Sequence, residues 1–290
     1  MNRTPPAAVI RELRTEVGFG CPVRDCGNPY LEWHHFDPPW SIQQHHNPQG
    51  MVALCAEHHK KADNGAYTNE QLTDLKRNPY KSNLVAGRFD WRRNKILAVV
   101  GGNFYYENPR ILVIDGQDVV AVRRDEDGYL LLSVGMLSLT REERVILRDN
   151  CWENIGKPTD LISPPNGRKL SIRYENGDQL SVEFLEITEA SAFENKYNRD
   201  LRDELEFPLT VVEINCRIGG TDLVLSPSAT SIRGTVYTGC FIANNPVGLS
   251  INIGMKWRQN WCLIQEPTSR LSPCPCGSGT RYKHCHGSLA

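Results

Sequence analysis

Histidine is absent from the middle of this sequence, and long apolar runs are absent throughout. The 290 residues contain no stretch of about eighteen apolar residues, so no membrane span is predicted. The first residues, MNRTPPAAVIREL, lack the long apolar core of a signal peptide, and we therefore expect a cytoplasmic protein. The formal net charge of −1 argues against a uniformly basic nucleic-acid-binding protein.

The near-zero net charge is an average over segments of opposite sign. Residues 1–95 carry a net charge of +3 and residues 255–290 a net charge of +4, whereas residues 96–254 carry −8. A polyanion would be attracted to the two ends and repelled by the middle. The charge distribution therefore places nucleic-acid contacts at the ends of the chain.

Cysteine and histidine gather at the same two ends. None of the eight histidines falls between residues 96 and 254, and six of the ten cysteines cluster with them at the two ends, at positions 21–55 and 274–285. In a chain without a secretory signal, such clusters indicate metal sites rather than disulfides. Four cysteines stand singly among apolar or aromatic neighbours and are predicted to be buried thiols: Cys151, Cys216, Cys240 and Cys262.

Residues 96–265 have the pattern of a mostly β domain. Short β-rich runs such as KILAVV and YLLLSV alternate with glycine turns. KLSIRYENGDQLSVEF alternates cleanly around Asn176-Gly177, which predicts a β-hairpin with one buried face. A helical stretch is expected at about 189–206. We predict a sandwich or two packed sheets, with neither a recognisable catalytic set nor a glycine-rich phosphate loop.

The N-terminal region predicts a small metal-organised domain with short helices. Thr4 is expected to cap a helix through AAVIRELRTEV, and Thr68 with Gln71 resembles a capping box for QLTDLKRN. Between them, residues 21–63 show little periodicity, as in domains where ligand bonds replace a core. The predicted fold class is α+β, in four parts: a domain at 1–80, a linker at 81–95, the β domain at 96–265 and a tail at 266–290.

Four N-terminal residues have the spacing of a zinc site. Cys21 and Cys26 are separated by four residues, and Cys55 and His58 by two. Together they supply three thiolates and one imidazole, a ligand set that suits tetrahedral zinc. Three further histidines accompany this set and are not needed for it: His34, His35 and His59.

This segment resembles the HNH nuclease family, also called the ββα-metal fold. The matching text is CPVRDC, LEWHHF and GMVALCAEHHKKAD, over about residues 10–78. Members of that family hold a structural zinc on one face and a catalytic divalent ion on the other, so the resemblance implies zinc together with Mg²⁺ or Mn²⁺. It assigns the structural zinc to four residues: Cys21, Cys26, Cys55 and His58.

The resemblance also implies roles for the remaining histidines. It places His34 and His59 at the ligand positions of the catalytic ion and His35 at the general-base position. Asp63 lies one helical turn after His59 and would face the same ion. Phosphodiester hydrolysis needs an ion to stabilise charge on the phosphate, and a base with a pKa near 7 to activate water. Neighbouring residues of a strand point to opposite faces, so the family geometry also requires a local turn here.

One position departs from the family pattern. Gly50 stands directly before MVALC, where the family usually has an asparagine, and Asn47 is the nearest substitute. We predict an orienting role for Asn47, while His45 and His46 stay unassigned, with phosphate and the ion as alternative contacts. Four basic residues are predicted to contact DNA phosphates: Lys60, Lys61, Arg92 and Arg93.

The tail contains a second metal-ligand spacing. CPCGSGTRYKHCH resembles the SEC-C motif, the zinc element at the tail of the bacterial SecA translocation motor and of many unrelated proteins. Two interpretations stay open: a docking element for protein or nucleic acid, and a stabilising cap without a partner. The resemblance implies a second structural zinc with four ligands: Cys274, Cys276, Cys285 and His286.

The leading hypothesis is a metal-dependent HNH endonuclease that hydrolyses DNA. An acidic β domain attached to a nuclease suggests regulation by assembly or by a protein partner, as in an effector of prokaryotic antiphage defence. Some defence nucleases pair an HNH domain with a β-rich module that docks on a short Argonaute protein, which is one expected partner by analogy. Two alternatives remain: a restriction-type enzyme whose middle domain reads DNA, which the acidity disfavours, and a catalytically silent zinc adaptor for DNA or protein.

Overall fold

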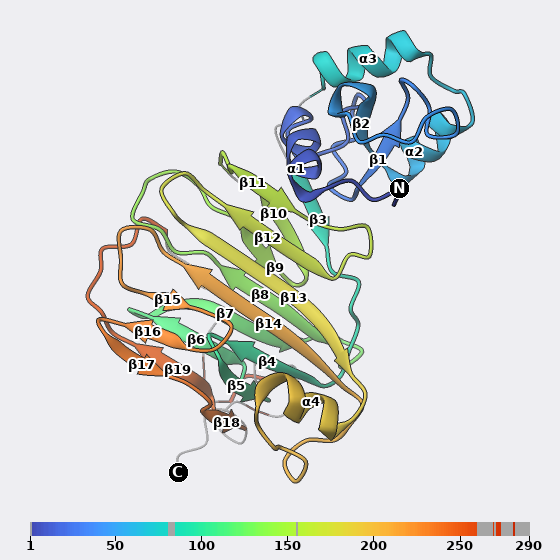
Figure 1. The fold of residues 1–290 in the computed structure, drawn as a ribbon. Coiled ribbons are helices and arrows are strands. Elements are labelled where there is room, and N and C mark those ends of the chain that lie inside the picture. The colour runs from blue at the N-terminus through green and yellow to red at the C-terminus, as the bar shows by residue number, and fades with distance from the viewer. Residues whose placement is uncertain are drawn as a thin grey trace.

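The computed structural model describes residues 2–80, 85–154, 156–259, 269, 271–273 and 281. These residues form an α+β structure with many strands and few helices. An N-terminal unit lies at one end of a larger β body (Figure 1). None of the helices in these residues is long and apolar enough to cross a membrane.

The N-terminal unit places a two-stranded sheet among its helices. Strands β1 and β2 pair antiparallel, with His34 opposite Val52 and Leu31 opposite Cys55. All five residues of β2 are buried, and the core also contains Leu13 and Leu72 from the first and third helices. In chain order the elements are α1 (Ala7–Glu16), β1 (Leu31–His35), the 3₁₀ helix η1 (Pro48–Gly50), β2 (Met51–Cys55), α2 (Ala56–Asp63) and α3 (Asn69–Arg77).

The sequence predicted the N-terminal cap of α3 correctly and that of α1 wrongly. The capping box of α3 is confirmed: Thr68 Oγ1 accepts from the Gln71 backbone, and the Gln71 side chain accepts from Thr68 N–H. The prediction of Thr4 as the cap of α1 is wrong. The helix begins at Ala7 with Pro6 at the N-cap position, because Ile10 N–H bonds to the Pro6 carbonyl, and no side chain caps this end.

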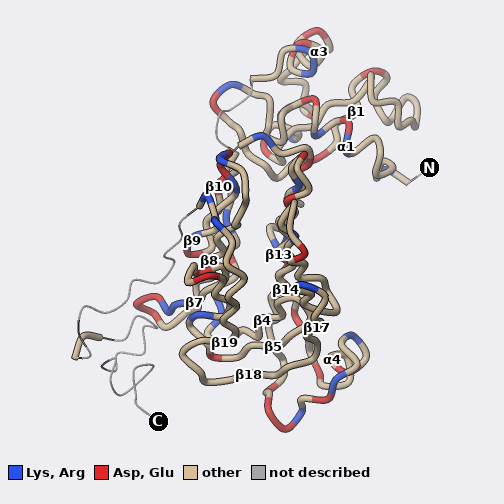
Figure 2. Tube along the Cα trace, turned by 90° about the vertical axis from the view of Figure 1, so that its left-hand side faces the viewer, with Lys and Arg blue, Asp and Glu red and all other residues tan. Residues whose placement is uncertain are grey.

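The β body is a sandwich, one of the two architectures expected for it. Figure 2 shows its two sheets edge-on and facing each other. Among the described residues, one sheet has seven strands in the order β19-β6-β7-β8-β9-β10-β3. Its strands are β3 (Val85–Arg88), β6 (Arg110–Ile114), β7 (Gln117–Arg124), β8 (Leu130–Gly135), β9 (Ile146–Arg148), β10 (Cys151–Asn154) and β19 (Val247–Ile251).

The second sheet runs from β11 to β17 and is extended on one side by three further strands. Strand β4 pairs parallel with β14, and β5 joins β4 to β18. The described strands of this sheet are β4 (Ile96–Val100), β5 (Asn103–Tyr106), β11 (Asp160–Ile162), β12 (Lys169–Arg173), β13 (Gln179–Ile187), β14 (Leu209–Arg217), β15 (Val224–Leu225), β16 (Thr230–Ile232), β17 (Thr235–Tyr237) and β18 (Phe241–Ala243).

The predicted hairpin is confirmed as β12 and β13. Their register pairs Lys169 with Glu183 and Arg173 with Gln179. The turn closes when Tyr174 N–H bonds to the Asp178 carbonyl, and Gly177 supplies the positive φ of 90° that a glycine adopts easily. Alternate residues of β13 face the core, as the sequence pattern requires.

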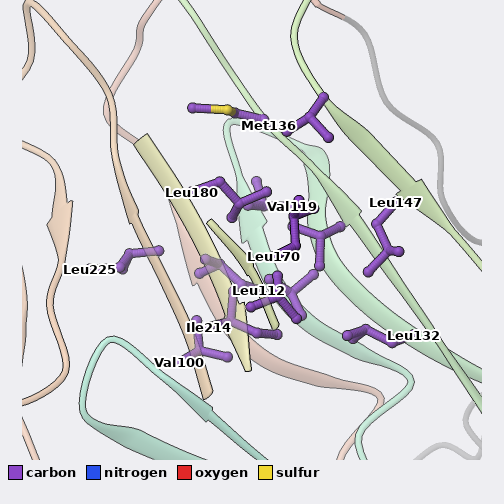
Figure 3. Packing of buried hydrophobic residues seen from close by; sticks show 14 of the residues in the cluster. Val100, Leu112, Val119, Leu132, Met136, Leu147, Leu170, Leu180, Ile214 and Leu225 are labelled. Carbon is purple, nitrogen blue, oxygen red and sulfur yellow. The ribbon is translucent and has the colours of Figure 1, made fainter. Parts of the chain in front are cut away.

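The main core fills the space between the two sheets. Leu112, Leu132 and Leu147 enter it from the seven-stranded sheet, and Leu170, Leu180 and Ile214 from the other (Figure 3). A smaller cluster on the outer face of the second sheet packs Phe193 of α4 (Ala190–Tyr197) against Leu97 and Val211. Helix α4 is shorter than the predicted 189–206, because Asn198 adopts a left-handed conformation and ends it.

Part of the expected linker belongs to the body. Residues 85–88 form β3, which pairs with β10 at the edge of the seven-stranded sheet. Among the described residues, an apolar contact, an ion pair and hydrogen bonds join the N-terminal unit to the body. Phe19 packs into the main core, Arg14 pairs with Asp160 of β11 at 2.9 Å, and the Tyr30 hydroxyl both donates to and accepts from the Arg88 backbone.

The described lone cysteines differ in exposure despite their apolar or aromatic neighbours in the sequence. Cys216 is partly buried against the core, and burial raises the pKa of its thiol to about 12. Cys151 and Cys240 are exposed, so their predicted burial is wrong. Cys151 precedes the buried Trp152 on β10, and alternation turns it outward. Cys262 lies outside the described residues.

Candidate metal centres

The structure brings Cys21, Cys26, Cys55 and His58 together, with their ligand atoms within 4.8 Å of one another. Nδ1 of His58 lies 3.4 Å from Sγ of Cys21 and 3.2 Å from Sγ of Cys55, and the Cys26 and Cys55 sulfurs are 3.8 Å apart. Cys55 stands at the junction of β2 and α2, so the strand and the helix together fix its position beside His58.

These distances fit a tetrahedral zinc ion. Bonds of about 2.3 Å to sulfur and 2.0 Å to nitrogen separate tetrahedral ligands by about 3.5–3.8 Å. The 3.8 Å between Cys26 and Cys55 is far longer than a disulfide bond of about 2.05 Å. Burial raises the pKa values of the Cys21 and Cys55 thiols, and a cation offsets the cost of holding thiolates there. The cluster therefore can hold zinc.

A second group combines His34 of β1 with His59 and Asp63 of α2, again with ligand atoms within 4.8 Å. His34 Nδ1 lies 3.2 Å from Asp63 Oδ1, and the two imidazole rings are 5.3 Å apart. Burial, followed by the neighbouring His59, lowers the pKa of His34, which favours the neutral form that binds metal ions. One helical turn separates His59 from Asp63, so α2 presents both on one face.

Glu32 contacts this group through His59 and was not among the residues predicted for the site. Its Oε2 lies 2.9 Å from Nδ1 of His59. Among the described residues, Nε2 of His59 is buried without a hydrogen-bond partner. A carboxylate on one ring nitrogen orients the other toward a metal ion in many metal sites. Strand alternation was the available signal, because Glu32 and His34 share one face of β1.

His35 lies apart from both groups. Its ring contacts Trp40 at 4.7 Å, His45 at 5.3 Å and His46 at 6.0 Å between centroids. Within the described part of the chain, neither ring nitrogen has a hydrogen-bond partner. Burial, followed by His45 and His46, lowers its pKa to about 4, so the ring is neutral at pH 7 and free to accept a proton. It is also a weaker base than one with a pKa near 7.

The connection between β1 and β2 is fixed by His45 and Asn47. Nε2 of His45 donates to the Pro38 carbonyl at 2.9 Å, and its Nδ1 accepts from Asn47 N–H at 3.0 Å. The Asn47 side chain accepts from Gln49 N–H and caps η1, so its observed contact is with the backbone of its own turn. The structure thus gives Asn47 a positioning contact and shows none with His35.

The departure at Gly50 has a steric cause. A Cβ atom there would lie 1.8 Å from the Asp37 carbonyl oxygen, so no side chain fits. The Gly50 carbonyl also accepts from Phe36 N–H and Asp37 N–H, which closes the loop onto the end of β1. An asparagine at this position would therefore require a different loop.

The four predicted phosphate-binding residues fall into two pairs. Lys60 and Lys61 are exposed on α2, and Lys61 forms a 2.6 Å ion pair with Glu57. Arg92 and Arg93 are instead engaged by the β body. Arg92 pairs with Asp127 at 2.9 Å, and Arg93 donates to Thr210 at 3.0 Å.

The proposed tail ligands, Cys274, Cys276, Cys285 and His286, lie outside the described residues. On either side of the first two, Pro273 and Arg281 form an isolated antiparallel bridge. A model of the SEC-C motif matches residues 272–288. SEC-C is a zinc-binding motif, so the expectation of zinc chemistry in the tail is supported.

Comparison with curated proteins finds SecA protein translocase subunits. The subunit of Acinetobacter baylyi is 65% identical over 26 residues, and that of Bordetella petrii is 76% identical over 21. The subunit of Granulibacter bethesdensis is 35% identical over 80 residues. These matches cover 9%, 7% and 27% of this chain but only 3%, 2% and 7% of the relatives. The similarity thus concerns the tail motif, and no solved structure matches the chain.

Proposed function

We propose that residues 1–80 are an HNH endonuclease domain of the ββα-metal type that hydrolyses DNA phosphodiester bonds. The observation that carries the proposal is the grouping of His34, His59 and Asp63 beside a separate Cys₃His cluster. The first group joins β1 to α2, and the second includes the β2–α2 junction. Two antiparallel strands followed by a helix, with one metal group catalytic and the other structural, is the arrangement that the HNH resemblance implies.

His34, His59 and Asp63 would hold Mg²⁺ or Mn²⁺, with Glu32 orienting His59. When bound, the ion supplies charge stabilisation at the phosphate and the leaving oxygen. His35 is neutral at pH 7 and accepts the proton of the attacking water in this proposal. Lys60, exposed on the same helix as His59, is placed to attract the DNA backbone.

The two zinc elements would be structural, one within the N-terminal unit and one in the tail. The acidic β body would control the nuclease or bind its partner, in keeping with an effector of prokaryotic antiphage defence. Supporting this view, Arg14 and Asp160 form a mostly buried pair between unit and body, and Phe19 enters the main core. Such contacts hold the proposed nuclease unit against the body, in addition to the chain segment that connects the two.

A second candidate, a catalytically silent zinc adaptor that binds DNA or protein, is favoured by one observation. His35 lies among Trp40, His45 and His46 rather than in the second metal group, and its pKa is about 4. An adaptor needs the Cys₃His cluster but has no requirement for a base.

Plasmid cleavage separates the two candidates. Purified protein is incubated with supercoiled plasmid and Mg²⁺ or Mn²⁺, and wild type is compared with His35→Ala. The nuclease predicts cutting by wild type and a loss of at least about 100-fold in His35→Ala. Equal cutting by both proteins would remove the proposed role of His35. No cutting by either, even with candidate partners present, would favour the adaptor. Discrete fragments would indicate restriction-type specificity, and a smear an indiscriminate effector.

A further inference from the structure

The chain between β1 and η1 forms an ordered loop beside His35. Ile42 N–H and Gln43 N–H both bond to the Pro39 carbonyl, at 2.8 Å and 3.1 Å, and Phe36 forms a bridge with Pro39. His45 ties the two ends of the loop together through Pro38 and Asn47. These bonds hold residues 38–44, here called the finger loop, in one conformation.

The finger loop is uncharged and carries an exposed apolar tip. Residues 38–44 contain no Lys, Arg, Asp or Glu. Ile42 is 77% exposed, the highest value among the large hydrophobic residues that the structure describes. An ordered loop that holds isoleucine in water, next to a candidate catalytic histidine, is suited to contacting an apolar surface that arrives with the substrate.

Trp40 adds an aromatic surface at the base of the same loop. Its ring lies nearly parallel to that of His46, at 28° and 5.5 Å between centroids. It also contacts His35 at 4.7 Å. The proposed proton acceptor is therefore flanked directly by aromatic rings on the side toward the finger loop.

We propose that the finger loop binds unpaired DNA bases next to the phosphate that is cut, with Trp40 and His46 as a stacking surface and Ile42 as an apolar contact. This inference rests on the proposed nuclease function. His35 follows His34 of the metal group directly on β1, so in this proposal the nucleotides beside the bound phosphate extend toward His35 and the loop. Aromatic side chains that stack on bases are the usual device of proteins that bind single strands, and isoleucine is among the side chains that wedge between bases.

The absence of charge on the finger loop decides between backbone and base as its ligand. Lys and Arg are the side chains that neutralise phosphate charge, and the finger loop has none, whereas α2 carries the exposed Lys60 and Lys61. The uncharged loop can offer a phosphate only the neutral side chains of Ser41, Gln43 and Gln44, whereas Trp40 and Ile42 offer a base an aromatic and an apolar surface. In a continuous duplex the faces of the bases are stacked on each other, so the preferred substrate would be single-stranded or locally unpaired DNA.

The test measures affinity without added Mg²⁺ or Mn²⁺, so that the DNA stays intact. Fluorescence anisotropy with the full, zinc-loaded chain compares a labelled single strand, its duplex, and a strand of equal length with abasic sites. The inference predicts tighter binding of the intact strand than of the other two. Trp40→Ala should weaken single-strand binding by about tenfold, and Trp40→Phe should keep most of the affinity.

Ile42→Ala keeps the test informative if Trp40→Ala fails to fold, because Ile42 is exposed and its removal leaves the core intact. It should also weaken single-strand binding, by less than Trp40→Ala. The matched control is Val236→Ala, since Val236 is 61% exposed on β17 of the body. This control should bind as wild type does.

The outcomes separate the inference from the function on which it rests. If wild type cuts plasmid but binds the intact and abasic strands equally, or if Ile42→Ala and Trp40→Ala bind as wild type does, the nuclease stands and the base-binding role is overturned. If wild type neither binds nor cuts any DNA, both are overturned.

Discussion

Glu32 Oε2 lies 2.9 Å from Nδ1 of His59 and joins strand β1 to helix α2 at the candidate catalytic metal group. His59 Nε2 is buried and has no hydrogen-bond partner among the described residues. Nδ1 of His59 also lies 3.8 Å from Oδ2 of Asp63, so Glu32 and Asp63 both approach this side of the ring. This relationship supports an orienting role for Glu32.

Removing Glu32 should weaken binding of the ion proposed for the group of His34, His59 and Asp63 without removing one of these ligands. We expect Glu32→Ala to lower the affinity for Mn²⁺ by about 10–100-fold, because His59 loses the carboxylate that orients it. Glu32→Gln keeps a hydrogen-bond acceptor, so its affinity for Mn²⁺ should lie between those of the wild type and Glu32→Ala. Isothermal titration calorimetry measures the change, with the exposed Glu57→Ala as control. An unchanged affinity in Glu32→Ala would show that Glu32 does not act through His59.

Zinc content should report the two structural sites separately. Cys55→Ala should lose one zinc per chain, since three ligands from side chains no longer close the tetrahedron. A chain that ends at residue 272 should lose the other, whereas His59→Ala should keep both. Native mass spectrometry counts the ions. One zinc or none in the wild-type chain would contradict the ligand assignments.

Gly50→Ala should disturb the connection between β1 and β2, which contains the finger loop and the turn at Asn47. Its Cβ would overlap the Asp37 carbonyl at 1.8 Å, so the loop must move. We expect a loss of about 1–3 kcal/mol in the free energy of unfolding and lower nuclease activity. Gly50→Asn, the residue usual in the HNH family, should be no better. Gln49→Ala is the matched control, because its side chain is exposed beside the same turn. Wild-type stability in Gly50→Ala would contradict this packing.

The buried pair of Asp178 and Arg144 should contribute to the acid sensitivity of the body. Its atoms are 2.8 Å apart, and both side chains are at most 1% exposed. Burial opposes ionisation of Asp178, but bonds from Ser138, Arg144, Asn176 and Gly219 outweigh it and lower its pKa. Because the folded-state pKa lies below the unfolded value of about 3.9, this contribution is complete above that pH and is lost as the pH falls through the folded pKa.

Urea unfolding at pH 7 should show that Asp178→Ala costs about 3–5 kcal/mol, since it leaves the buried Arg144 charge with only a longer, 3.4 Å ion pair to the exposed Glu142. The exposed Asp200→Ala removes a similar ion pair with Arg202 and should change stability by less than about 0.5 kcal/mol. Equal effects of the two substitutions would mean that the buried pair is not a main support of the body.

Features encoded by neighbouring residues were predictable from the sequence. The capping box of Thr68 and Gln71, the β12–β13 hairpin and the two halves of the Cys₃His cluster are all signalled by short spacings. Each of these features depends on geometry within a few residues. Such geometry can be recognised in the sequence from a period of 2 residues in a strand, a period of 3.6 in a helix, or the spacing of metal ligands.

Features that depend on tertiary packing could not be predicted from the sequence. The pairing of β3 with β10 turned part of the expected linker into a strand, and the outward side of β10 exposed Cys151. The surroundings of His35 also could not be foreseen, because Trp40, His45 and His46 reach it only through the fold of the β1–η1 connection.

We propose above all that His34, His59 and Asp63 would hold the ion for DNA cleavage. Plasmid cleavage in Mg²⁺ or Mn²⁺ by wild type and His59→Ala, each with its zinc content measured, tests it most directly. The account predicts cutting by wild type, a loss of at least about 100-fold in His59→Ala, and two zinc ions per chain in both. Equal cutting by the two proteins, or none by wild type with candidate partners present, would contradict it.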